Sequence, residues 1–173
     1  MSGGDPVATI RATAKDPKRQ ATQLWQEGLE LTLSGDVETA IDLYQQSIAL
    51  HPTAEAYAFW GWALSSEGKL DEAISMCHEA IKIDPDFGNS YNDIGAYLEV
   101  QGRRDEAIAW FKRAKEARQY DHREFPYLNL ARIYILQKRW GEALLELQAA
   151  EVLAPRDERV DMLIARVAEH FNT

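Results

Sequence analysis

Residues 60–74 decide the fold, and they read WGWALSSEGKLDEAI. Gly61 and Ala73 of this stretch belong to two columns that recur along the chain. The first column holds Gly28, Gly61, Gly95 and Ala131, and the second holds Ala40, Ala73, Ala107 and Ala143. Both columns are spaced by 33, 34 and 36 residues, and the columns of Leu64 and Cys77 share these intervals. One set of intervals in several columns indicates four copies of a repeating unit.

Each unit is predicted to contain two helices joined by a short turn. In the second unit, apolar residues recur at helical spacing over residues 54–67 and again over 70–83. Gly68 marks the turn, because glycine tolerates a left-handed backbone, and Asp84-Pro85 ends the second helix. Gly61 lies in mid-helix, where glycine costs about 1 kcal/mol relative to alanine. We expect close packing against the helix that contains Ala73 to compensate this cost.

The recurring pattern resembles the tetratricopeptide repeat. The residues on which this resemblance rests are Trp60-Gly61-x-x-Leu64, Gly68, Asp71-Glu72-Ala73-Ile74, Ala80 and Asp84-Pro85. The resemblance covers about residues 21–155. It implies an all-α, right-handed α-solenoid of four helix-turn-helix repeats, at about residues 21–53, 54–87, 88–123 and 124–156. Three residues depart from the family pattern: Ala131 in a glycine column, Lys138 in a turn-glycine column, and Gln119 where a proline would fall.

The ends of the stack and one junction differ from the repeats. Residues 1–19 lack strong periodicity and are predicted to be a flexible tail. Residues 157–173 are predicted to form a C-terminal capping helix, with a dimerisation helix as the alternative. Its apolar stripe is Val160, Leu163, Ile164, Val167 and Phe171. The junction at residues 118–126 is longer than its counterparts. We expect a longer second helix before Pro126, and the alternative is a binding or assembly element.

Composition disfavours several functional classes. The formal net charge of −9 and the pI of about 4.9 disfavour binding to nucleic acid and to anionic membrane surfaces. No stretch is long and apolar enough to insert into a membrane, no secretory signal is visible, and a cytoplasmic location is expected. Cys77 falls in an apolar core column, and the four histidines lack metal-ligand spacing. Phosphate loops and nucleophile elbows are absent, so we expect no enzyme activity, no cofactor and no metal.

The family resemblance also implies a concave groove lined mainly by the first helices. Its N-terminal half carries aromatic residues, which commonly anchor partners. Its middle carries amides that can bind a peptide backbone and acids that favour Lys or Arg on the ligand. We therefore predict a protein or peptide partner with apolar anchors and a basic residue, unless the tail or a neighbouring helix covers Trp25 and Trp62. The predicted peptide-binding residues are Trp25, Leu29, Phe59, Trp62, Asn89, Asn92, Asp93, Glu99, Phe125, Asn129 and Arg132.

One known binding mode of the family is excluded by the residues. Chaperone-binding members clamp a terminal carboxylate with Lys, Asn and Arg side chains. The equivalent positions here are Trp25, Leu29, Phe59, Asn89 and Asp93, which include no cation. The leading hypothesis is therefore an interaction scaffold of another specificity. A self-assembling structural protein, a homo-oligomer that uses the stack ends or residues 118–126, is the alternative. A non-catalytic accessory subunit of an enzyme complex has no positive support in the sequence.

Overall fold

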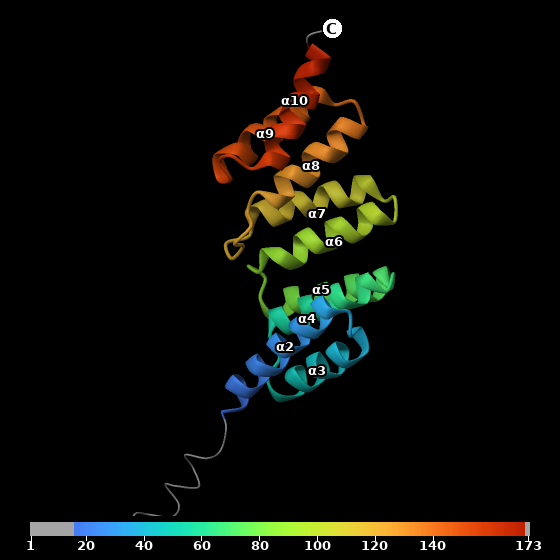
Figure 1. Ribbon diagram of the computed structural model, residues 1–173, viewed down its shortest axis with the longest axis vertical. Helices are drawn as coiled ribbons and strands as arrows, with labels where there is room; N and C mark the ends of the chain where they lie inside the picture. The colour runs from blue at the N-terminus through green and yellow to red at the C-terminus, as the bar shows by residue number, and fades with distance from the viewer. Residues whose placement is uncertain (1–15, 172–173) are drawn as a thin grey trace, which may run out of the picture.

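The computed structural model describes residues 16–171, which form an all-α stack (Figure 1). Consecutive helices pair as antiparallel hairpins, and a last helix follows the fourth hairpin. Within this part of the chain the helices are α2 (Pro17–Ser34), α3 (Val37–Leu50), α4 (Ala54–Ser66), α5 (Leu70–Ile83), α6 (Gly88–Val100), α7 (Arg104–Glu116), α8 (Phe125–Leu136), α9 (Trp140–Leu153) and α10 (Glu158–Phe171). The tail predicted over residues 1–19 lies mostly outside the described residues, and α2 already begins at Pro17.

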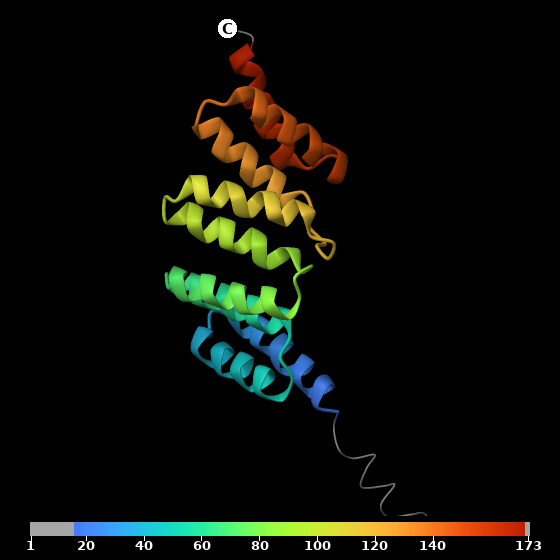
Figure 2. The same cartoon turned by 180° about the vertical axis from the view of Figure 1, so that it is seen from behind.

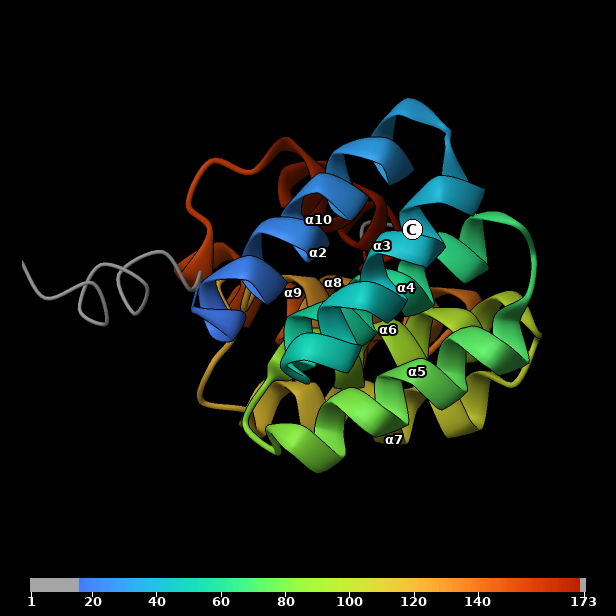
Figure 3. The ribbon, with the colours of Figure 1, turned by 90° about the horizontal axis from the view of Figure 1, so that it is seen from below.

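The hairpins stack as a solenoid, as the repeat predicts. From α4 on, each first helix contacts its own partner, the second helix before it and the next helix of the inner layer, and α2 contacts α3 and α4. The view from behind shows the same succession of hairpins (Figure 2). Seen from below, α5 and α7 form one margin of the molecule (Figure 3). First helices therefore form a continuous inner layer, and the second helices lie outside it.

The predicted close packing at the mid-helix glycines is confirmed. A Cβ placed on Gly95 of α6 would lie 2.6 Å from Cε1 of Phe111 on α7, and one on Gly28 would lie 2.9 Å from Cε1 of Tyr44. Real Cβ atoms do not approach other carbons this closely. The rings of Tyr44 and Phe111 are themselves fully buried. Glycine at these positions thus lets a large ring of the second helix lie directly on the backbone of the first.

The hairpin turns share one backbone geometry, including the turn without glycine. Gly35, Gly68 and Gly102 have positive φ angles of 93°, 77° and 78°. Lys138 takes the equivalent place with φ of 58°, a conformation that costs residues with a Cβ. The Arg139 N–H donates to the Tyr134 carbonyl at 2.8 Å, as Arg103 donates to Leu98 at 2.9 Å in the preceding turn. The repeat geometry therefore prevails over the local preference of lysine.

The junction before α8 differs from our expectation of a longer second helix, which is wrong. Helix α7 ends at Glu116, and residues 117–124 form a loop that folds back on the preceding junction. The Gly88 N–H donates to the Gln119 carbonyl at 2.8 Å, and the Gln119 N–H donates to the Asp86 carbonyl at 3.0 Å. Tyr120 is buried against Gly88. These pairings hold the loop's first half, while Pro126 opens α8 as expected.

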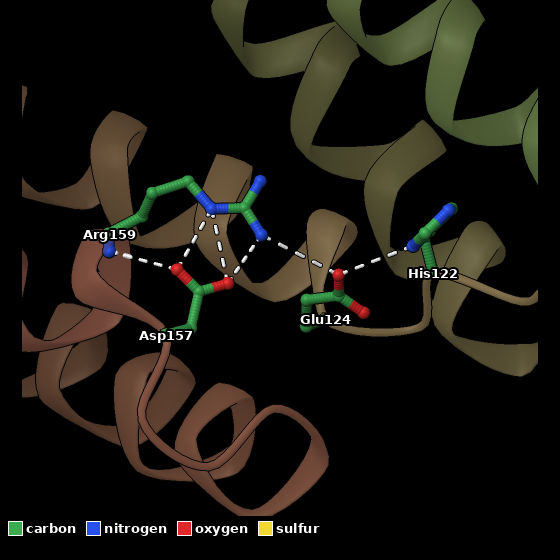
Figure 4. Close-up of polar contacts among 4 residues, drawn as sticks. All are labelled: His122, Glu124, Asp157 and Arg159. Carbon is green, nitrogen blue, oxygen red and sulfur yellow. Dashed lines mark hydrogen bonds and ion pairs between the residues drawn. The ribbon is translucent and has the colours of Figure 1, made fainter.

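The C-terminal helix packs on the fourth hairpin through part of its predicted stripe. Val160 and Val167 are fully buried, and Leu163 and Ile164 pack against the same core. Phe171 is 60% exposed, so its assignment to the buried stripe is wrong. The helix is also tied to the loop before α8 by the Arg159 guanidinium, which lies between the carboxylates of Asp157 and Glu124 (Figure 4).

We expect Gly95→Ala to lower the free energy of unfolding by about 1–3 kcal/mol, because the added methyl group overlaps the Phe111 ring. Gly141→Ala on α9 is the matched control, since nothing lies within 4 Å of its Cβ. There the same change should raise stability by up to about 1 kcal/mol. Urea denaturation of both variants measures the difference. Equal effects at the two sites would contradict the packing argument.

Lys138→Gly should raise the free energy of unfolding by about 0.5–1 kcal/mol, because glycine adopts the left-handed conformation of this turn without strain. Lys112→Gly, in the middle of α7 and also exposed, should instead lower stability by about 1 kcal/mol. Thermal and urea denaturation test the opposite signs. A loss of stability at both positions would show that Lys138 is not strained.

Candidate functional site

The inner layer carries an aromatic patch at its N-terminal end, formed by Trp25 of α2 with Phe59 and Trp62 of α4. Trp25 and Phe59 stack with ring centroids 5.4 Å apart and planes inclined by 18°. Both are half-buried and pack on the core around Tyr44. Trp62 keeps 37% of its surface exposed. The sequence analysis expects all three rings to be exposed, whereas in the structure Trp62 is exposed and Trp25 and Phe59 are half-buried against each other.

The two asparagines predicted to bind a peptide independently are joined in the structure. Asn129 Nδ2 on α8 donates to Asn92 Oδ1 on α6 at 3.0 Å, and Arg132 Nη1 donates to Asn129 Oδ1 at 3.4 Å. Asn92 is 7% exposed, so little of its amide remains for a ligand. Asn129 is half-buried and Arg132 is exposed. The pair connects two repeats across the floor of the inner layer.

Asp93 is a half-buried acidic residue at the middle of the inner layer. Burial raises the pKa of Asp93 to about 7, although a hydrogen bond from Asn92 acts in the opposite direction. Tyr97 follows one turn later, and its buried hydroxyl has no hydrogen-bond partner among the described residues. Burial, and next the charge of Asp93, raise the pKa of Tyr97. The sequence missed Tyr97, although its spacing of four from Asp93 is the helical signal of a shared face.

The C-terminal end of the inner layer has two adjoining hollows that share Arg132. One, of about 210 Å³, is lined by Phe125, Leu128, Asn129, Arg132 and Arg159. The other, of about 280 Å³, is lined by Glu99, Arg132, Ile135, Leu136, Leu163 and Arg166. The predicted residues Phe125, Asn129, Arg132 and Glu99 therefore do lie together. The sequence analysis did not place Arg159, Leu163 and Arg166 in the groove, because it interpreted residues 157–173 as a capping helix or a dimerisation helix.

Arg159 and its carboxylates fix the first of these hollows. The guanidinium hydrogen-bonds Asp157 through Nε at 2.9 Å, and its Nη2 lies 3.6 Å from Glu124 Oε1. These hydrogen bonds lower the pKa of Asp157 to about 2. The guanidinium also lies over the Phe125 ring, on which His122 stacks with centroids 5.0 Å apart. His122 approaches Glu124 from the other side (Figure 4).

Two of the predicted residues, Asn89 and Leu29, are not part of the clusters described above. Asn89 lines a hollow of about 380 Å³ beside Glu55 and the loop residues Arg118 to Asp121. Leu29 is half-buried on α2. Within residues 16–171, no group of three or more His, Cys, Asp or Glu side chains is placed to hold a metal ion. Among the described helices, none has the length and apolar character that crossing a membrane requires.

Comparison with known proteins identifies the repeat. The family model described as Tetratricopeptide repeat matches residues 27–86 and 60–122, which together cover more than half of the chain. The chain belongs to the tetratricopeptide repeat family. The solved structure of pilF from Pseudomonas aeruginosa shares this tetratricopeptide fold, with a TM-score of 0.84 and 20% identity over 91% of this chain and 72% of that chain.

Two further tetratricopeptide proteins are similar in sequence. The chain is 29% identical over 147 residues to small glutamine-rich tetratricopeptide repeat-containing protein 2 of Saccharomyces cerevisiae, covering 84% of this chain and 41% of the relative. It thus spans less than half the length of that relative. The second tetratricopeptide domain of Spaghetti (RPAP3), solved with the HSP90 peptide SRMEEVD, is 26% identical with a TM-score of 0.54 over 58% of this chain and 94% of that chain.

Asp93→Asn should remove a pH dependence of stability. The folded-state pKa of Asp93 lies near 7, above its value of 3.8 in a model compound. Between these values the folded state binds more protons than the unfolded state, so stability falls as pH rises from about 4 to 7. The asparagine variant should therefore be more stable than the wild type by about 1–3 kcal/mol at pH 8, and much closer to it at pH 4.

Urea denaturation across this pH range measures the effect of Asp93→Asn. Asp42→Asn on the exposed face of α3 is the control for loss of one negative charge. The burial argument would be contradicted if the unfolding free energy of the Asp93 variant changed with pH as in the wild type. It would also be contradicted if the Asp42 variant lost the same pH dependence.

Proposed function

We propose that this chain is a non-catalytic adaptor that binds a peptide segment of a partner protein along the inner layer of its first helices. The observation that carries the proposal is Trp62, a large apolar ring that remains 37% exposed beside the stacked pair of Trp25 and Phe59. Tryptophan is among the commonest residues that dominate binding energies. Repeats of this family generally mediate protein–protein interactions.

The chemistry along the inner layer supports a ligand of mixed character. The aromatic patch would accept an apolar anchor. Asp93 and Glu99 lie farther along the stack, and within the described residues neither forms an ion pair. A Lys or Arg of the ligand would supply the missing countercharge to Asp93, and would favour its ionised form. The proposed ligand therefore has an apolar residue that binds at the aromatic patch and a basic residue that binds beside Asp93.

The specificity differs from that of the terminal-carboxylate clamp. A related tetratricopeptide domain was solved with the acidic peptide SRMEEVD. In this chain the clamp positions of the first three repeats hold Trp25, Leu29, Phe59, Asn89 and Asp93. They include no Lys or Arg, and the Asp93 carboxylate would repel a ligand carboxylate. A cytoplasmic location belongs to the proposal, and cell fractionation tests it.

Trp62→Ala should weaken binding of selected peptides at least tenfold, because the side chain supplies the exposed part of the aromatic patch. Peptides are first selected by the wild-type protein from a displayed random library, and their affinities are then measured by fluorescence polarisation. Leu145→Ala is the matched control, since Leu145 is 67% exposed on the outer helix α9. Circular dichroism should show nearly unchanged helicity in both variants. Equal affinities for wild type and Trp62→Ala would refute the assignment of the aromatic patch as the anchor.

Self-assembly is the second candidate, and a specific observation favours it. At the end of the stack, Met162 and Phe171 of α10 are 68% and 60% exposed. Exposed apolar side chains of this size on a terminal helix suit contact with a second copy. Light scattering over a range of concentrations tests this candidate, because a strict monomer excludes it.

A further inference from the structure

Helix α10 occupies the place that the first helix of a fifth repeat would take. It packs against α9 and also reaches α8, just as α8 packs against α7 and reaches α6. Residues 159, 163 and 166 of α10 are spaced by four and three, which places them on one face of the helix. All three line hollows with residues of α8. Helix α10 therefore contributes a wall of the inner layer, besides covering the last hairpin.

Two arginines of these hollows have no carboxylate partner among the residues that the structure describes. Arg159 is neutralised, because it lies between Asp157 and Glu124 (Figure 4). The guanidinium of Arg132, in contrast, contacts only the Asn129 amide oxygen at 3.4 Å. Arg166 is exposed, and its side chain forms neither a hydrogen bond nor an ion pair with other residues in the range 16–171.

The hollow shared by these arginines also has an apolar wall and one acid. Leu136 is 56% exposed beside Ile135 and Leu163. Glu99 lines the same hollow but forms no ion pair with either arginine within the described part of the chain. Two guanidinium groups against one carboxylate leave a surplus of positive charge, in a protein whose formal net charge is −9.

We propose that the hollow between α8 and α10 binds an acidic residue of a partner protein together with a neighbouring apolar residue. The carboxylate pairs with Arg132 and Arg166, since guanidinium groups bind carboxylates through two parallel hydrogen bonds. The apolar side chain lies on Leu136 and Leu163. This site is distinct from a clamp on the first three repeats, because it uses the fourth repeat and α10. The inference rests on the proposed function in that both place the partner segment on the inner layer.

Charge reversal tests the site directly. The wild type and the double variant Arg132→Glu/Arg166→Glu are used to select peptides from the same displayed random library. We expect the wild type to enrich peptides in which Asp or Glu adjoins Leu, Ile, Met or Phe. The double variant should bind these peptides at least tenfold more weakly and should select Lys or Arg at the acidic position. Arg104→Glu/Lys112→Glu is the control, with the same change of charge on exposed positions of the outer helix α7.

The outcomes separate this inference from the proposed function. The inference alone is overturned if Trp62→Ala abolishes peptide binding while the double arginine variant selects the same peptides as the wild type. Loss of the acidic preference on charge reversal, with affinities unaffected by Trp62→Ala, supports the inference and overturns the aromatic anchor. Selection of no peptide by the wild type overturns both. Two further results would show unspecific attraction of anions and would also overturn the inference. One is that heparin displaces a bound peptide as well as the selected peptides do. The other is that the control variant weakens peptide binding as much as the double arginine variant does.

Discussion

The structure depends on how closely the two helices of each hairpin approach. The backbone of α6 at Gly95 lies against the ring of Phe111, leaving no room for a Cβ between them. The same contact recurs between Gly28 and Tyr44. This spacing fixes the angle within a hairpin, and the angle in turn decides which side of the first helix remains open. Trp62, Asp93 and Arg132 belong to first helices, and each lies close in sequence to the residue of its helix that packs on the second helix, namely Gly61, Gly95 and Ala131.

The repeat was predictable because its constraints are local and recur. Each glycine and alanine column reports the same helix–helix contact, so the sequence identifies the four hairpins and their turns, even where Lys138 replaces a turn glycine. The pairing of Asn92 with Asn129 was not predictable in this way. It joins residues 37 positions apart on neighbouring repeats, and their distance depends on the rotation between repeats. That rotation comes from the summed packing of three helices, which no single column records.

The longer junction shows the same limit of sequence periodicity. Two extra residues before α8 could extend a helix or form a loop, and helical spacing does not distinguish these outcomes. The deciding interactions are distant in sequence: Gly88 leaves space for the Tyr120 ring, and Gln119 pairs with the backbone of residues 86 and 88. The absence of proline at Gln119 fits this arrangement, because its N–H donates to Asp86.

The charges of the inner layer would give the proposed peptide segment a direction. Among residues 16–171, Asp93 on α6 has no countercharge in the middle, whereas Arg132 and Arg166 have no carboxylate partners toward the C-terminal end. A segment that places a basic residue near α6 and an acidic one near α8 satisfies both, and the reversed segment satisfies neither. Helix α10 stabilises the stack and also contributes to its charge pattern. Val160 and Val167 cover the hydrophobic end of the stack, while Arg166 lines the hollow shared with Arg132. In the proposed binding mode, Val160 and Val167 cover the stack, Arg166 selects the ligand, and Leu163 contributes to both the core and the hollow.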